Sequence, residues 1–389
     1  MNKNKTVPLE EIEIIRLKSN QSINESNLMT VPFVSMQRQK VGVIERIWET
    51  PNGTKGIKVV GSAELGCPTI LELDTLLALF RILVKNVDYK YEYNRNTGRV
   101  SLPRTIHFTY QSLAKELGFA HYGGTVKKRL EKSIKSLVEA TLYSNFALLD
   151  IKDGYVGEYF EEISGERSFR ILTNYKAYSY KRKKKNGEKI GNAQEVKEQQ
   201  SVDIDEFFFN NICNNYFKIY DYSKYIKLTK GLSKKLYLLL CQWSTNYEKK
   251  LKYETLYDYL SIDVGDKQYY YNRLIKETLD ELQEVGFIQG YEVQKSQGVN
   301  IIFNKTKKAI ATGLNKYNDE RDIIGRLGEL GFGIEEVVKY YRLDNEEYLK
   351  ALLRYVDDKI EKGDTIKDLK KYVEKGIKSE GYDVSRYMN

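Results

Sequence analysis

A pattern of apolar and polar positions occurs twice along the chain. The first copy has apolar positions at Tyr110, Leu113, Leu117 and Phe119, and the second has them, at the same spacing, at Tyr253, Leu256, Leu260 and Ile262. After a turn, a second apolar run follows at helical spacing, with Leu130, Ile134 and Leu137 repeated as Ile275, Leu279 and Leu282. A short helix, a turn, a longer helix and an extended segment are the parts of a winged helix-turn-helix, which mostly places one helix in the major groove of DNA.

The same pattern predicts the other elements. Helices are expected at 71–85, 110–117 (capped by Thr109), 125–138, 234–246 (capped by Ser233), 253–260 and 267–285. A strand is expected at 98–108, hairpins at 41–62 and 287–303, and a long wing of the first copy at 141–172. The region after 305 is expected to be all helix.

These elements predict an α+β chain with two tandem winged helix-turn-helix domains followed by an all-helical C-terminal domain. The expected divisions are a flexible N-terminal arm at 1–30, winged-helix domain 1 at 31–180, a basic and polar linker at 181–204, winged-helix domain 2 at 205–305 and the helical C-terminal domain at 306–389.

The positive charge lies where the two copies lie. The formal net charge is +9, yet residues 306–389 hold 17 Lys and Arg against 17 Asp and Glu, so the whole excess belongs to residues 1–305. A basic body with a neutral tail fits a body that binds a polyanion such as DNA. Many soluble proteins are mildly basic, so charge alone favours nucleic acid only weakly.

The long helix of each copy has an outer face that could meet DNA. With Ile275 and Leu279 turned inward, Tyr271 is expected on the inner side, while Tyr270 and Arg273 point outward. The later outer positions Glu277, Asp280 and Glu284 are acidic, so only the first two turns are expected to approach phosphates closely. Helix-turn-helix recognition helices contact bases with these N-terminal residues.

In the first copy the outer face is basic along its length, which suits phosphate contacts. The hypothesis is therefore that the second copy reads bases and the first contributes affinity; the alternative is that both faces are merely solvated. The candidate DNA-binding residues are Thr125, Lys127, Lys128, Arg129, Lys132, Lys135, Lys267, Tyr269, Tyr270, Arg273, Lys276, Lys181, Arg182 and Lys183.

No catalytic group is apparent, so the chain is not expected to be an enzyme. Its only histidines, His107 and His121, are too far apart in sequence for the paired metal-binding histidines of strand-nicking initiators. No G-x-x-x-x-G-K-[ST] loop is present, and no cofactor or metal is expected. Three scattered cysteines indicate a reducing compartment. The absence of an N-terminal targeting signal and of a long apolar run favours a cytoplasmic protein with no membrane partner.

Several stretches resemble the replication initiator protein A family of plasmid-type initiators. They lie at 32–36, 43–48, 56–61, 66–74, 205–208 and 231–237, within roughly residues 30–305, and the segment 367–382 looks like the C-terminal helices often appended to such initiators. The resemblance implies binding of repeated double-stranded sites at an origin, local melting and recruitment of the replicative helicase. It also implies repression of the protein's own promoter, with a monomer that initiates and a homodimer that represses.

Two other functions stay open from the sequence. One is a sequence-specific transcriptional regulator without a replication role, which would keep repression after deletion of residues 306–389, whereas an initiator would lose replication. The other is a structural adaptor whose winged helices bind protein; it would show no affinity for DNA and would keep its partner in high salt.

Overall fold

The structure, a computed structural model, describes residues 12–36, 40–50, 53–152, 160–163, 168–181, 196–260, 262, 264–265, 267–294, 297–304, 327, 330–332, 336, 346–361 and 368–379 of the 389-residue chain. The chain forms two compact units, 1–245 with 250–288 and 293–299, and 246–249 with 289–292 and 300–389. It is a mixed α/β protein.

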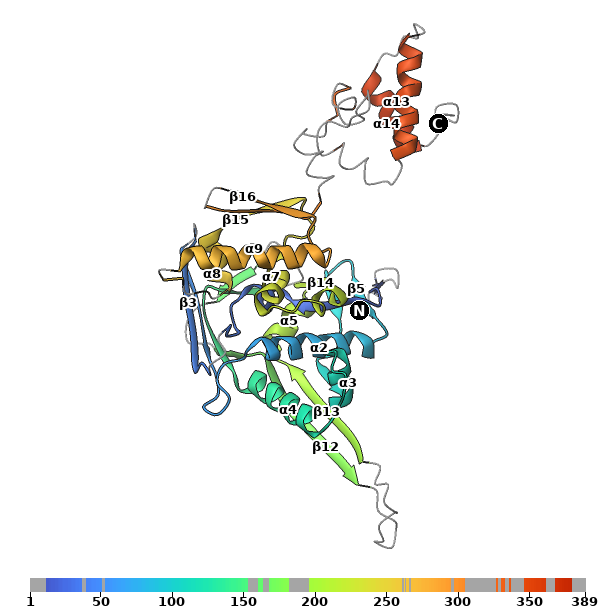
Figure 1. The fold of residues 1–389 in the computed structure, drawn as a ribbon. Coiled ribbons are helices and arrows are strands. Elements are labelled where there is room, and N and C mark those ends of the chain that lie inside the picture. Colours follow the sequence, from blue (N-terminus) through green and yellow to red (C-terminus); the bar gives the residue numbers. More distant parts are fainter. Residues whose placement is uncertain are drawn as a thin grey trace, which may run out of the picture. The chain divides into compact units, whose positions relative to one another are not determined.

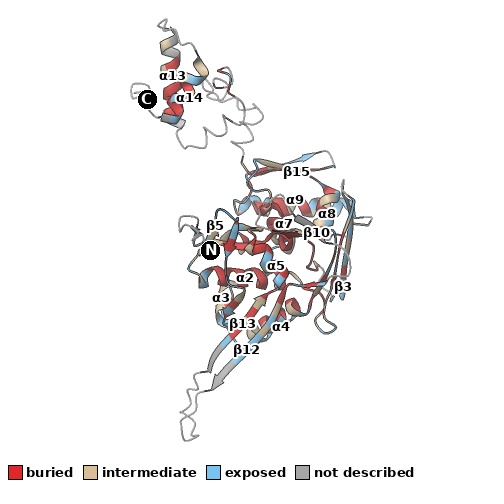
Figure 2. Cartoon of the chain, turned by 180° about the vertical axis from the view of Figure 1, so that it is seen from behind, coloured by how far each residue is buried: buried red, intermediate tan, exposed pale blue. Residues whose placement is uncertain are grey.

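Helix α2 (Ile70–Asn86) lies at the centre of the first unit, and most of its residues are buried, as Figure 2 shows in red. It begins with a capping box, in which Thr69 and Glu72 satisfy each other's backbone N–H groups. Apolar residues then occupy almost every face, so α2 can pack on all sides. The helix predicted at 71–85 is confirmed.

The first copy consists of α2, four further elements and one strand that completes a hairpin later in the chain. These elements are β7 (Thr105–Phe108), α3 (Tyr110–Glu116), α4 (Gly124–Glu139), β12 (Leu172–Lys181) and β13 (Val196–Ile204). Their strands form a sheet in the order β12-β13-β7. The Thr109 cap of α3 is confirmed, because its side chain accepts from the Ser112 backbone N–H at 3.0 Å.

The second copy has the same order of elements. It runs through α7 (Gly231–Cys241), β15 (Glu248–Lys252), α8 (Tyr253–Leu260), α9 (Gln268–Glu284), β16 (Gly290–Gln294) and β17 (Gly298–Ile302). Its sheet order is β15-β17-β16, so the last strand is central in both copies. Helix α7 begins after Lys230, and the predicted cap Ser233 is wrong because Ser233 lies inside the helix.

The predicted long wing at 141–172 is wrong. The strands β8 (Thr141–Asn145) and β11 (Ser168–Arg170) instead join the hairpin of β3 (Val43–Thr50) and β4 (Gly53–Val60), in the order β11-β8-β4-β3. Strands β9 (Leu148–Ile151) and β10 (Phe160–Ile163) pair separately. Strands β8 to β11 are thus an insertion between α4 and β12. The alternation of apolar and polar residues predicts strands but does not predict which strands pair.

The predicted linker at 181–204 is also wrong for the residues that the structure describes. Residues 196–204 form β13, which pairs with both β12 and β7. The hairpin β12–β13 extends away from the helices of the first unit (Figure 1). The predicted residues Arg182 and Lys183 lie outside the described residues.

The predicted flexible arm is wrong for residues 12–30. They form β1 (Ile12–Arg16), β2 (Gln21–Glu25) and α1 (Ser26–Thr30). Strand β1 pairs with β5 (Lys90–Asn94), which pairs with β6 (Arg99–Ser101), and β2 pairs with β14 (Phe217–Asp221). Within this buried stretch, the Glu25 carboxyl group accepts from Asn27 and from Asn211 of α5 (Glu206–Cys213), and Asn27 also bonds to the Leu149 backbone.

Elements of the two predicted winged-helix domains are therefore interleaved in one unit. Strand β2 lies before the first copy and pairs with β14, which precedes the second copy and the short helix α6 (Tyr222–Tyr225). Helix α1 also packs against α7. A cut at 204/205 would divide these contacts.

The second unit contains α13 (Glu346–Glu361) and α14 (Leu369–Ser379), which confirms helix in the described part of the tail. Leu349, Leu352, Val356 and Val373 form part of its apolar core. The Tyr348 hydroxyl donates to the Gly376 carbonyl at 2.9 Å and joins the two helices. No helix in the described part of the chain is long and apolar enough to cross a lipid bilayer.

Candidate nucleic-acid interface

Helix α4 is fixed to α2 by its inner face. Leu130, Ile134 and Leu137 are fully buried, and the Ser133 hydroxyl donates to Thr75 Oγ1 of α2 at 2.8 Å. Because an α-helix repeats every 3.6 residues, this packing directs the basic positions outward. The orientation expected for α4 is confirmed.

The outer face of α4 carries most of the positive charge predicted for it. Thr125, Lys128, Arg129, Lys132 and Lys135 are exposed. The Lys135 ammonium lies 2.9 Å from Glu131, and both the hydrogen bond and the charge of that carboxylate raise the pKa of Lys135. Lys128 and Lys132 are four residues apart and share this face, while Arg129 lies to one side, 5.9 Å from the Phe119 ring centre, so the face keeps an excess of positive charge.

The α4 surface continues onto strand β12. Lys127 is half-buried, with its ammonium 5.7 Å from the centre of the Tyr110 ring. The Tyr110 hydroxyl in turn bonds to the hydroxyl of Tyr175 in β12. Burial raises the pKa of Tyr175, and the charges of Lys135 and Lys127 act on it in the opposite direction. The two lysines and the hairpin therefore share one surface.

Helix α9 is fixed to α7 through an acidic side chain. Glu281 accepts hydrogen bonds from the Thr229 backbone N–H at 2.6 Å, the Thr229 hydroxyl at 2.8 Å and the Ser233 hydroxyl. Partial burial acts to raise the pKa of Glu281, but these hydrogen bonds outweigh it and hold the pKa below its usual value. The carboxylate thus joins α9 to the start of α7.

The first two turns of α9 present the predicted residues to solvent. Lys267 is exposed, and the exposed fractions are 85% for Tyr269 and 45% for Tyr270. The Arg273 side chain is 60% exposed, which confirms that it points outward. Its guanidinium lies 5.6 Å from the Tyr270 ring centre, and its Nε lies 3.5 Å from Glu277.

The remaining candidate positions are less exposed or lie outside α9. Tyr271 was expected on the inner side and is half-buried, with its ring centre 5.2 Å from that of Tyr270. Lys276 is half-buried on the flank. Lys181 ends β12 and pairs with Val196, the first residue of β13.

A hollow of about 580 Å³ beside the start of α9 was missed by sequence reasoning. Its charged lining residues are Lys250 and Lys252 of β15 and Glu254 of α8, and its polar lining includes Gln268, Gln294 and Gln297. The run Lys249-Lys250-Leu251-Lys252 before α8 was the available signal, but only the sheet order brings it beside α9.

Gly298 allows the close approach of strands at this hollow. A Cβ atom on Gly298 would lie 2.2 Å from the Leu251 carbonyl oxygen, much closer than atoms can pack. Glycine is therefore needed where β17 meets β15.

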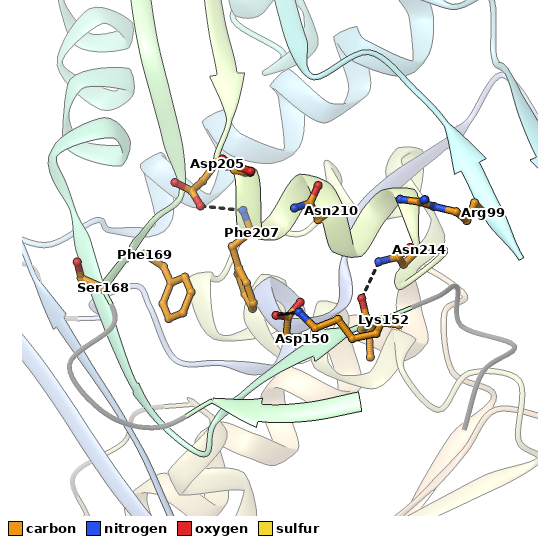
Figure 3. Close-up of a pocket in the computed structure, with 11 residues that line it drawn as sticks. Arg99, Asp150, Lys152, Ser168, Phe169, Asp205, Phe207, Asn210 and Asn214 are labelled. Carbon is orange, nitrogen blue, oxygen red and sulfur yellow. Dashed lines mark hydrogen bonds and ion pairs between the residues drawn. The ribbon is translucent and has the colours of Figure 1, made fainter. Parts of the chain in front are cut away.

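A second hollow, of about 560 Å³, has a different character (Figure 3). The Lys152 ammonium lies 2.5 Å from Asp150, and the Asn214 amide donates to the Ile151 carbonyl at 2.6 Å. Asp205 caps α5 through the Phe207 N–H, and burial raises the pKa of Asp205. Charges of both signs line this hollow and partly neutralise each other, so it is not a polyanion site.

Neither metal nor thiol chemistry is indicated in the described residues. No group of three His, Cys, Asp or Glu side chains among them could hold a metal ion. Cys67, Cys213 and Cys241 are free thiols, the first and last of them buried.

Comparison with known proteins identifies the family. The model of the family described as replication initiator protein A matches residues 23–261, more than half of the chain. A crystal structure of domains 2 and 3 of RctB is similar with a TM-score of 0.45 and 14% identity, covering 71% of this chain and 97% of that one. A second structure of RctB domains 2–3 has a TM-score of 0.39 and 13% identity, covering 69% and 94%. No curated protein sequence matched. The chain belongs to the replication initiator protein A family, and its role lies in the initiation of DNA replication.

Proposed function

We propose that the protein binds repeated double-stranded sites at a replication origin through two winged helix-turn-helix modules. The observation that carries the proposal is the duplication: two modules have one element order and one sheet order, and each turns the polar face of its long helix outward. Family membership supplies the context of replication.

The two long helices have different parts in this proposal. Helix α9 enters a major groove with its first two turns, where Arg273 can read a guanine edge, while Glu277 and Glu284 keep its second half away from phosphates. Helix α4 contacts the phosphate backbone through Lys128 and Lys132. The second copy therefore gives specificity and the first gives affinity.

Melting and loading follow from binding in this proposal, without catalysis by the chain. Two modules on successive turns bend the duplex, and the strain promotes opening of an adjacent AT-rich segment. The C-terminal helices recruit the replicative helicase. A homodimer occupies the same sites in the promoter and represses transcription.

Separate substitutions test the division of labour. Binding is measured with a duplex from the DNA that flanks the gene, identified by footprinting, and with a random duplex. Arg273→Ala should cost about 1–3 kcal/mol on the specific duplex and reduce discrimination, while Lys128→Ala should weaken both duplexes alike and lower the salt slope by about 1. Lys58→Ala, at an exposed lysine of β4, is the control.

The reverse pattern would show that the assignment is backwards. If Lys128→Ala lost discrimination while Arg273→Ala kept it, α4 would be the reading helix. If the unchanged protein bound neither duplex at low salt, the proposal of DNA binding would fail altogether.

A further inference from the structure

We infer that Tyr269 is a base-stacking residue, whose ring packs on the face of a nucleobase when α9 meets DNA. The inference rests on the proposed function, since it requires α9 to approach DNA. It adds a contact to an unstacked base that edge reading by Arg273 does not supply.

The first observation is the exposure of the ring. Tyr269 is 85% exposed, the largest exposed fraction among the large apolar side chains that the structure describes. An aromatic ring that stays in water contributes no hydrophobic stabilisation to the fold. Stacking on a base would remove its apolar faces from water. A ring on a rigid helix also loses little conformational entropy when a base covers it.

The second observation is the contrast with the neighbouring tyrosines. Three consecutive residues of an α-helix point about 100° apart, so Tyr269, Tyr270 and Tyr271 face different directions. Tyr270 packs its ring against Tyr271 and carries the Arg273 guanidinium, so it positions that guanidinium. No hydrogen bond, ion pair or ring contact occupies Tyr269 within the described part of the chain.

The third observation is the polar, basic surround. Gln268 beside it lines the hollow that also holds Lys250, Lys252 and one carboxylate, Glu254, and Lys267 lies two residues before it, so positive groups outnumber negative ones here. The first turn of α9 holds no acidic residue. Positive groups that hold a backbone next to an aromatic ring are the arrangement by which proteins bind unstacked bases.

The test uses the full-length chain and two probes. One is an AT duplex of about 30 base pairs, roughly three helical turns, and the other is oligo(dT) of the same length; each carries 5-iodouracil. After irradiation, the crosslinked peptide is identified by mass spectrometry, and affinity is measured in parallel. The variants are Tyr269→Leu and Tyr269→Phe, with Tyr143→Leu as the matched control at an exposed tyrosine of β8.

Tyr269→Leu should weaken binding about 5- to 150-fold, the range that stacking of one base supplies, and abolish the crosslink at position 269. Tyr269→Phe keeps the ring and should bind like the unchanged protein, as should Tyr143→Leu. A loss on the duplex would identify a wedge between base pairs, and a loss on oligo(dT) alone would identify stacking on opened DNA.

The inference would be wrong if Tyr269→Leu bound DNA as tightly as the unchanged protein, or if the crosslink mapped elsewhere. If Arg273→Ala still weakened binding in that case, the proposed function would stand. If the unchanged protein bound neither probe nor the footprinted duplex, the proposed function itself would be the part that fails. Equal thermal unfolding midpoints of all variants would show that each one folds.

Discussion

Glu25 and Lys235 are ionisable side chains that the fold buries at opposite ends of the short helix α1. The Glu25 carboxylate accepts from the Leu28 backbone N–H and from the amides of Asn27 and Asn211. The Lys235 ammonium donates to the Val31 carbonyl at 2.6 Å and lies 5.3 Å from the Phe33 ring centre. Burial raises the pKa of Glu25 to about 8 and lowers the pKa of Lys235 to about 7.

These shifts predict how stability depends on pH. Between pH 4.5 and about 8 the folded chain keeps a proton on Glu25 that the unfolded chain releases, so stability should fall as pH rises, by up to about 1.4 kcal/mol per pH unit. Glu25→Gln keeps one side-chain acceptor oxygen where the carboxyl group has two, so one of the N–H donors of Leu28, Asn27 and Asn211 loses its partner and the variant starts less stable. Denaturant titrations from about pH 5 to 7 should nevertheless show a smaller fall for this variant than for the unchanged protein.

Lys235 should act in the opposite direction at higher pH. From about 7 to 10.5 the folded chain releases a proton that the unfolded chain keeps, so stability should rise with pH, and Lys235→Met should remove that rise. The same titrations from about pH 7 to 10 measure it. An unchanged rise in the variant would show that another group is responsible.

At the scale of elements, the docking of α9 depends on Glu281. Its three hydrogen bonds predict that Glu281→Ala lowers the free energy of unfolding by about 1–3 kcal/mol, because bonds to a charged acceptor are lost. Glu284→Ala, at an exposed carboxylate in the last turn of α9, is the control. Equal unfolding midpoints in the two variants would contradict this role.

Helices α3, α4, α8 and α9 could be predicted from the sequence because each has one apolar face at helical spacing. The sheets could not, because β8 and β13 have the alternation of any strand, and their partners are set by segments far away in the chain. The segment 21–30 reads as a loop, because Glu25 and Asn27 depend on partners far away in sequence, Asn211 of α5 and the Leu149 backbone of β9. The outward direction of Arg273 followed from spacing, whereas the hollow at Lys250 needed the sheet order.

At the scale of the whole molecule, the charge distribution predicts the response to salt. The net charge of +9 lies outside the neutral residues 306–389. If each module neutralises three to five phosphates, affinity should fall about 10³- to 10⁵-fold between about 50 and 200 mM salt. Titrations of one duplex across this range give the slope, and a flat response would argue against phosphate contacts.

The pairing of β2 with β14 has a consequence for how the protein is made. Ile23 of β2 and its partner Ile219 of β14 are about 200 residues apart in sequence. At about 5–20 residues per second, a ribosome needs roughly 10–40 s to supply the later partner after the earlier one has emerged. During that interval β2 has an unpaired edge, which chaperones can bind. Slower synthesis should lengthen the time for which this edge is exposed.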